Sequence, residues 1–384
     1  MNLQGQKQQA MGSAGNALVQ DGSILFYNPG GMSFLNSNST ILSGNATIGN
    51  TAFQDASTQV ISRTQSPVGT PFAAYTVFSV KDSSRLKLGM GVYTPFGSAI
   101  SWEEDWTGRF ALRSIKLQSI FFQPTLSYRL TDNFSFGAGF VYSSGSVQLK
   151  KDLPVQDQYG NYGNATLEGK ASGMGFNAGV LFKPNEKLSF GLSYRSGINM
   201  QVKKGTATFS VPSSLAPNFP NGNFTATLPL PSVFTFGFSY LPTSKLSFVL
   251  DVNYGGWKSY EALEFDYENN TSSLTDTYSA RNYKNNFAFR SGMQFQKDEK
   301  TFLRAGLGYV LSPVPDGFVT PETPDANRIN YTAGIGKKLG KNFTIDASLT
   351  FANPKRKDKN LETNLDGHYK TLVFIPGLSL EYSF

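Results

Sequence analysis

The stretch FTIDASLTF, residues 343–351, alternates apolar and polar side chains without a break. Successive side chains of a β-strand point to opposite faces. The stretch therefore predicts a strand with one apolar face and one polar face. The same alternation recurs in residues 188–195 and 234–240, and fourteen strand-like segments can be followed from Ile41 to the final residue, Phe384. We predict an all-β protein.

The connections between these segments alternate between two lengths. Turns of three to five polar residues lie at 81–84, 131–133, 184–186, 241–244, 297–300 and 340–342. Longer connections cover about residues 53–70, 96–112, 150–168, 204–222, 258–281, 313–326 and 354–369. Short turns on one rim and long loops on the other are typical of outer-membrane barrels. We predict a 14-stranded antiparallel transmembrane β-barrel that places both chain ends on the periplasmic side.

Charged residues within the strands test this prediction. A lipid-facing Arg or Lys near the bilayer midplane costs roughly 2–4 kcal/mol, so such charges belong on the lumenal face. Each charged residue in a strand interior falls on the same row of alternate positions as its polar neighbours. These residues are Arg129, Arg195, Asp251, Arg290, Arg304, Asp346 and Glu381. The same row is rich in glycine, which predicts a lumen with space to be filled.

Residues 1–40 do not alternate and contain six glycines among Gln, Ala and Ser. A barrel of about fourteen strands is wide enough to leak if its lumen is empty. We therefore expect residues 1–40 to form an N-terminal hatch inside the lumen of a barrel formed by residues 41–384.

Composition excludes several functional classes. The chain has no cysteine, so disulfides, thiol catalysis and thiolate metal sites are absent, and we expect no metal and no cofactor. The net charge of +7 is dispersed, apart from Lys355, Arg356, Lys357 and Lys359 in the last long loop. These residues predict a solvated tip near anionic lipid headgroups rather than a nucleic-acid arm.

The two chain ends also carry information. No signal peptide precedes Asn2, although export to an outer membrane requires one, so Met1 is interpreted as a trimmed start. The terminal Phe384 is on the apolar row and is similar to the signal by which the barrel-assembly machinery recognises outer-membrane proteins. We expect a monomer that contacts outer-membrane lipid and lipopolysaccharide.

Several motifs in order resemble the FadL family of outer-membrane transporters of hydrophobic compounds, including the TodX-like hydrocarbon transporters. The resemblance covers nearly the whole chain. Its motifs are QDG (20–22), FYNPGGM (26–32), GVYTPFG (91–97), WTGRF (106–110), QPT (123–125), YGGW (254–257) and SPVPDG (312–317), followed by Thr320-Pro321 and Pro324-Asp325.

The resemblance implies a hatch and a lateral exit for substrate at a kinked third strand. The family's Asn-Pro-Ala hatch motif corresponds to Asn28, Pro29 and Gly30, where glycine replaces alanine. The third strand is expected from Leu86 to Tyr93, and the pathway there includes Tyr93, Pro95, Phe96 and Gly97. Proline cannot donate to a strand ladder, which favours a pairing defect. The alternative is that Pro95 only ends the strand at a loop.

A hydrophobic substrate needs apolar surface and, if it is a fatty acid, a cationic partner. Burial of some fifteen methylenes favours an apolar site by on the order of 12 kcal/mol. The loop around Phe96, Trp102, Trp106 and Phe110 is a candidate capture surface. The candidate carboxylate partners are Arg109, Arg113, Arg129, Arg195, Arg290 and Arg304. For each arginine, structural pairing with an acidic residue is the alternative role.

Other functional classes remain open but have weaker support. His368 is the sole histidine and is expected in the last long loop, without partners for a catalytic triad or metal site. A barrel-embedded esterase or protease is the enzymatic alternative. Among non-enzymes, long-chain fatty acid transport is the first hypothesis, uptake of aromatic or aliphatic hydrocarbons the second, and a general diffusion porin the third.

Overall fold

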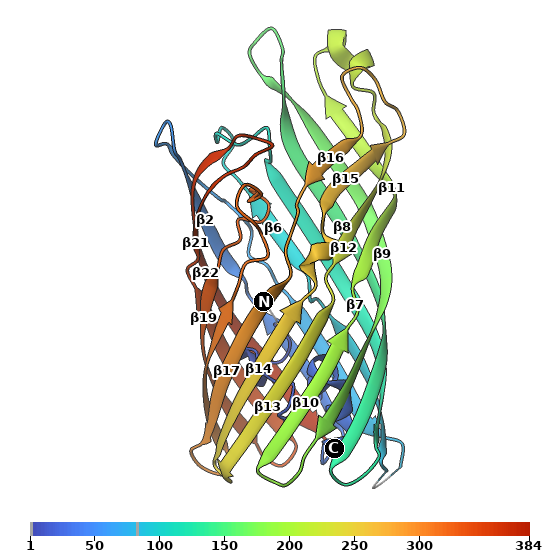
Figure 1. Cartoon of the computed structure of the whole chain (residues 1–384), viewed down its shortest axis with the longest axis vertical. Helices are drawn as coiled ribbons and strands as arrows, with labels where there is room; N and C mark the ends of the chain where they lie inside the picture. Colours follow the sequence, from blue (N-terminus) through green and yellow to red (C-terminus); the bar gives the residue numbers. More distant parts are fainter. Residues whose placement is uncertain (1–2, 82–83) are drawn as a thin grey trace.

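The computed structural model describes residues 3–81 and 84–384; Met1, Asn2 and, from the predicted 81–84 turn, Asp82 and Ser83 lie outside the described residues. The described chain is an antiparallel barrel with a ring of 14 strands (Figure 1). Its strand segments are β1 (Ser39–Asn45), β2 (Ile48–Asp55), β3 (Ile61–Arg63), β4 (Phe72–Ser79), β5 (Leu86–Tyr93), β6 (Gly97–Ser101), β7 (Ser114–Arg129), β8 (Phe134–Gln156), β9 (Tyr162–Phe182), β10 (Leu188–Arg195), β11 (Ile198–Ser210), β12 (Gly222–Leu230), β13 (Val233–Thr243), β14 (Leu246–Gly255), β15 (Ala262–Tyr267), β16 (Thr277–Ala280), β17 (Asn286–Gln296), β18 (Thr301–Val310), β19 (Arg328–Leu339), β20 (Phe343–Ala352), β21 (Lys355–Lys359) and β22 (Asp366–Ser383).

The described helices are short. They are α1 (Gln6–Gln9), α2 (Ile24–Tyr27) and three 3-10 helices, η1 (Pro29–Phe34), η2 (Ser213–Asn218) and η3 (Trp257–Ser259). None of them has the length and apolar character needed to cross a bilayer.

Consecutive wall strands pair, and the first and last strands close the ring. β1 pairs with β4 on one side and with β22 on the other, where Ile41 lies opposite Glu381. Several wall strands consist of two segments separated by an irregularity, such as β1 with β2 and β5 with β6. The fourteen-strand prediction is therefore confirmed, although many of its strands are interrupted.

Side chains face lumen and lipid as the alternation predicted. In β20, Phe343 and Leu349 on the outer face are 43% and 45% exposed, whereas Asp346 on the inner face is 1% exposed. The inner-face residues Asp251, Arg290, Arg304 and Glu381 are likewise buried. Polar groups thus fill the lumen and aromatic and aliphatic groups cover the outside.

The long-loop rim differs from the prediction. β8 and β9 contain 23 and 21 residues and pair almost to their tips, so only residues 157–161 connect them, instead of a loop of about 150–168. A tilted strand needs only about 9–11 residues to span a bilayer, so both rise well beyond it (Figure 1). β11, β15, β16 and β21 similarly occupy parts of other predicted loops. The inner faces of β11 and β15 pack on a buried rim core.

The N-terminal segment, residues 3–38, lies within the barrel (Figure 1) and is bonded to the wall along its length. Lys7 forms an ion pair with Glu381 of β22 at 2.5 Å. The backbone amides of Gly15 and Asn16 donate to one carboxylate oxygen of Asp251 in β14, at 2.8 and 3.0 Å. The amide of Gly12 donates to the Thr332 hydroxyl at 2.8 Å.

Lumenal glycines make room for this segment. A Cβ atom at Gly137 would lie 2.5 Å from the carbonyl oxygen of Pro29, and one at Gly334 would lie 2.5 Å from the Cβ of Ala10. Real Cβ atoms do not approach other atoms this closely, so any larger residue would displace the segment. The N-terminal segment thus explains several glycines of the inner row, although others, such as Gly139, contact barrel side chains instead.

Candidate functional site

A cavity of about 1240 Å³ occupies the barrel above the N-terminal segment. Its floor includes Phe26 and Tyr27, and its upper part includes Tyr260, Phe265 and Val314 from the rim. Ligand pockets commonly measure about 300–1,000 Å³ and combine apolar walls with a few polar groups. The volume and lining suit a hydrophobic molecule with one polar end.

Arg195, at the end of β10, is the first polar group of the cavity. Its guanidinium donates to the Tyr93 hydroxyl at 2.9 Å and to the Phe26 carbonyl at 2.8 Å. The Phe26 ring lies 4.3 Å from its Cζ, within cation–π range. Among the described residues, no carboxylate lies within ion-pair distance of Arg195. Its charge is therefore held in place by neutral groups.

Arg290, on β17, is the second polar group. Its Nε donates to Asn253 at 2.8 Å, and its Nη1 donates to the carbonyl of Gly12 at 3.2 Å. It also forms no ion pair with a described residue, although Asp251 lies opposite it on β14. The buried hydroxyl of Tyr27 and one oxygen of Asp251 have no hydrogen-bond partner in the described chain. A polar ligand group would find one free donor here, the Tyr27 hydroxyl, and one free acceptor, the Asp251 oxygen.

The remaining predicted arginines do not line the cavity. Arg304 forms a buried ion pair with Asp346 at 2.7 Å, and Arg129 lies beside the ring of Phe34. Arg109 pairs with Asp105 at 2.6 Å, and Arg113 pairs with Asp152 at 3.1 Å. Structural pairing with an acidic residue accounts for Arg304, Arg109 and Arg113, whereas Arg129 forms no described ion pair.

The cavity reaches a part of the wall where backbone pairing is interrupted. On the short-turn side of this part of the wall, the amide of Thr94 in the third wall strand donates to the Phe72 carbonyl at 3.0 Å. On its long-loop side, the Gln65 amide donates to the Ser101 carbonyl at 2.7 Å. Between these points, no described backbone hydrogen bond joins residues 66–71 to residues 95–100. Both stretches line the cavity.

Prolines explain this interruption. Pro67, Pro71 and Pro95 lack the N–H that a strand ladder requires. β5 has the predicted bounds, Leu86–Tyr93, and the strand resumes after Pro95 as β6, which pairs with β7 alone. Pro95, Phe96 and Gly97 line the cavity, whereas Tyr93 contacts Arg195 from just beneath it.

The Asn28-Pro29-Gly30 turn lies against the wall beneath the cavity rather than in its lining. The buried Asn28 side chain accepts from the Gly30 amide at 3.1 Å and donates to the Val180 carbonyl at 2.9 Å. The Gly30 carbonyl in turn accepts from Ser127 and Ser135 at 3.0 and 2.6 Å. The turn thus anchors the N-terminal segment to β7, β8 and β9.

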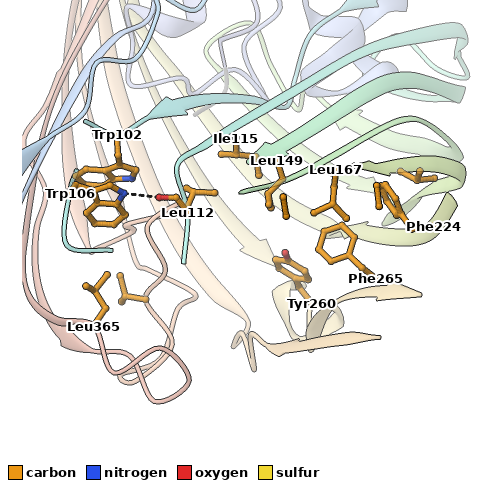
Figure 2. Close-up of a cluster of buried hydrophobic side chains, with 14 of the residues drawn as sticks. Trp102, Trp106, Leu112, Ile115, Leu149, Leu167, Phe224, Tyr260, Phe265 and Leu365 are labelled. Atoms are coloured by element: carbon orange, nitrogen blue, oxygen red, sulfur yellow. Dashed lines mark hydrogen bonds between the residues drawn. The ribbon is translucent and has the colours of Figure 1, made fainter. Parts of the chain in front are cut away.

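Trp106 and Phe110 also lie outside the cavity lining. Trp106 is 2% exposed and stacks on Trp102, with ring centroids 4.2 Å apart, and its indole N–H donates to the Leu112 carbonyl at 2.7 Å (Figure 2). Phe110 packs on Tyr162 at the outside of the rim. The two tryptophans form part of the rim core rather than an open surface.

Sequence reasoning missed several lining residues. Phe26 and Tyr27 precede the expected Asn28 turn, and Asn253 had no feature that distinguished it from other lumenal amides. The prolines at positions 67 and 71 were a usable signal, since they interrupt the second wall strand opposite Pro95. The described residues contain no cluster of three or more His, Cys, Asp or Glu able to hold a metal ion. His368 lies on β22 rather than in a loop.

Comparisons with known proteins agree with this architecture. The sequence matches the family described as "Outer membrane protein transport protein (OMPP1/FadL/TodX)" over residues 2–384. It is 26% identical to outer membrane protein P1 of Haemophilus influenzae, over 81% of this chain and 74% of that protein. It is 21% identical to the long-chain fatty acid transport protein of Escherichia coli K12, over 68% and 66% of the two chains.

Two solved structures share the fold. A Pseudomonas aeruginosa FadL homologue has a TM-score of 0.84 at 19% identity, covering 99% of this chain and 98% of that one. The P. putida toluene transporter TodX has a TM-score of 0.80 at 15% identity, covering 100% and 99% of the two chains.

Proposed function

Because this chain belongs to the OMPP1/FadL/TodX family of outer-membrane transport proteins, we propose that it takes up long-chain fatty acids or similar amphipathic molecules through its lumenal cavity. The family consists of transport channels and not of enzymes. The single observation that carries the fatty-acid proposal is the pair of cavity arginines, Arg195 and Arg290, whose guanidinium groups form no ion pair with a described residue.

The cavity suits both ends of such a substrate. An ionised carboxylate that leaves water requires charge-assisted hydrogen bonds, and Arg195 is oriented by Tyr93 and Phe26 to supply them. The buried Tyr27 hydroxyl adds a donor near Arg290. The acyl chain would lie along the apolar walls above, which include Phe265 and Val314.

The proposed route ends sideways in the membrane. The stretch without backbone pairing, residues 66–71 against residues 95–100, adjoins the cavity and carries Val68, which is 54% exposed; Phe72, directly below the stretch, is 40% exposed. An apolar solute that leaves there enters lipid directly and avoids the aqueous periplasm. We assign this stretch as the lateral exit and residues 95–97 as part of the pathway.

Residues 1–40 act in this proposal as a hatch and residues 41–384 as the barrel. The hatch blocks the lumen below the cavity, so a substrate that cannot descend leaves through the wall. The short-turn rim, near which the chain ends at Phe384, would face the periplasm, whereas Leu3, the first described residue, lines the cavity inside the barrel (Figure 1). The chain would be a monomer inserted by the barrel-assembly machinery, with Phe384 as part of the recognition signal.

Competition binding tests the substrate class. A labelled long-chain fatty acid should bind the purified protein and be displaced by unlabelled fatty acid far better than by an uncharged hydrocarbon of equal length. Equal displacement would favour the second candidate, hydrocarbon uptake, which the structural likeness to the toluene transporter TodX suggests.

Conductance tests the porin alternative. A protein without residues 1–38 should form ion-conducting pores in planar bilayers, whereas the intact chain should conduct little. High conductance of the intact chain would contradict the hatch and favour a general diffusion porin.

A further inference from the structure

The outer wall carries a group of cations directly above its lipid-facing band. β21, β22 and β2 lie side by side there (Figure 1). Lys370 of β22 lies opposite Lys355 of β21 on one side and opposite Ala52 of β2 on the other. Ala52 in turn lies opposite Arg63 of β3. Cross-strand partners point to one face of a sheet, so three cations share a row.

Burial of the intervening residues places this row on the outside. Tyr369 is 3% exposed and packs on Phe53 inside the rim, so its neighbours His368 and Lys370 point outward. Asp358 is buried and accepts from the amides of Gly317 and Val319, so Lys357 also points outward. Lys357 lies opposite His368, which forms a second row. We call Arg63, Lys355, Lys357 and Lys370 the outer cations.

The outer cations have no acidic partner in the described chain. None of them takes part in a described ion pair or side-chain hydrogen bond. Asp366, which lies opposite Lys359, is four residues from Lys370 along β22 and further from the membrane. Like charges directly opposite each other on adjacent strands are destabilising, so an anion from outside the chain would stabilise the Lys355–Lys370 pair. The small Ala52 between Lys370 and Arg63 leaves space for one.

The height of the group identifies the anion. Lys370 is two residues from Leu372 and four from Phe374, both 40% exposed on the lipid-facing side. At about 3.3 Å per residue and a tilt of about 40°, Lys370 lies on the order of 5–10 Å above this apolar band. The headgroup layer of a bilayer occupies that height.

We propose that the outer cations bind phosphate groups of the phosphorylated saccharide headgroup of lipopolysaccharide. The lipid chains would cover the aromatic band below, including the packed rings of Phe351 and Phe374. The headgroup phosphate would lie between Lys355, Lys370 and Arg63. The inference depends on a barrel whose long-loop rim faces the outer leaflet, and it concerns the outer wall rather than the cavity.

Lipid binding to the purified full-length protein tests the proposal. The probes are lipid A with two phosphates, the same lipid after enzymatic removal of its phosphates, and inorganic phosphate, with bound lipid counted by native mass spectrometry. The bisphosphorylated lipid should bind, and the dephosphorylated lipid should bind at least 10-fold more weakly. Millimolar inorganic phosphate should not displace the lipid.

Substitutions locate the site. Each basic residue near an anionic membrane surface contributes roughly a fivefold gain in affinity. Lys355→Gln with Lys370→Gln should therefore weaken lipid binding roughly 25-fold. The matched control, Lys297→Gln with Lys300→Gln, removes the same charge from an exposed turn at the opposite rim and should leave binding unchanged. Heat-modifiable gel mobility should show that both variants are folded.

Four outcomes would overturn the proposal. These are equal binding of the dephosphorylated lipid, unchanged binding in the double variant, equal loss in the control, and displacement by inorganic phosphate, which would indicate a free-ion site. Fatty-acid binding measured on the same samples should be unaffected by Lys355→Gln with Lys370→Gln. A loss of lipid A binding alone is therefore distinguishable from failure of the transport proposal.

Discussion

Arg195 on β10 donates a 2.9 Å hydrogen bond to the hydroxyl of Tyr93 on β5, and the two residues are joined across the lumen rather than along a strand ladder. Gln123 accepts from the same Tyr93 hydroxyl at 2.5 Å. This arrangement fixes a cation at the cavity floor, a few residues from the stretch without backbone pairing that begins after Thr94.

Replacement of Arg195 with Gln should weaken fatty-acid binding roughly 10- to 100-fold, because a hydrogen bond to a charged group contributes about 1.5–3 kcal/mol. Binding of an uncharged hydrocarbon should change little. Isothermal titration of both ligands measures the effect, and Arg85→Gln at the short-turn rim is the control. Equal loss for both ligands would indicate a structural role for Arg195.

Replacement of Val68 with Trp should reduce the uptake rate while leaving equilibrium binding intact, because Val68 lies at the proposed exit and not at the cavity floor. The control is Leu88→Trp, which adds the same ring to the outer face of β5, where strand pairing is continuous. Uptake of labelled fatty acid into cells separates the two variants. Similar rates for both would argue against a lateral exit at residues 66–71.

Replacement of Lys7 with Met should destabilise the seating of the N-terminal segment by about 3–5 kcal/mol, because it leaves buried carboxylates without their cation. Lys7 lies 3.3 Å from Asp21 and 2.5 Å from Glu381. Hydrogen exchange of residues 3–38 should accelerate, and single-channel conductance should rise. A more conservative Lys7→Arg variant should retain most of the protection; if Lys7→Met exchanges at the original rate, the ion pairs do not hold the segment.

Replacement of Gly30 with Ala restores the residue that the family motif carries, yet we expect it to be destabilising in this chain. The added Cβ would lie 2.8 Å from the Gly179 carbonyl oxygen and 3.0 Å from the Cα of Val180. Overpacking of this kind costs about 1–3 kcal/mol. Thermal unfolding should shift down, whereas Gly44→Ala, with open space around its Cβ, should have no effect. An unchanged midpoint for Gly30→Ala would show that the wall can yield there.

Much of the barrel follows from the sequence because water and lipid impose opposite demands on the two faces of a strand. The stretch 343–351 shows this, since each of its apolar residues was correctly assigned to the outside and Asp346 to the lumen. The extension of β8 and β9 beyond the bilayer was not predicted. Residues 150–168 are rich in Lys, Asp, Gly and Asn, which indicate a loop, and the rim core that holds them as strands forms only from distant segments.

The arginines illustrate a second limit of the sequence. Arg195 and Arg304 both lie on the polar row of their strands and have similar neighbours, so the alternation of side chains predicts the same role for both. Their roles differ because Asp346 lies within 2.7 Å of Arg304, whereas Arg195 meets Tyr93 and the Phe26 carbonyl. That difference depends on which side chains meet within the lumen, and a single sequence does not contain this information. The binding roles of Arg195 and Arg290 stay predictions.

The ion pair between Lys7 and Glu381 joins residues 374 positions apart, near the two ends of the chain. Because synthesis runs from the N-terminus, Lys7 is made 374 residues before Glu381. The N-terminal segment therefore cannot reach its final position until the last strand has been placed beside the first. The anchoring of Lys7, which is made before any strand of the barrel, is therefore completed only after the last strand is in place.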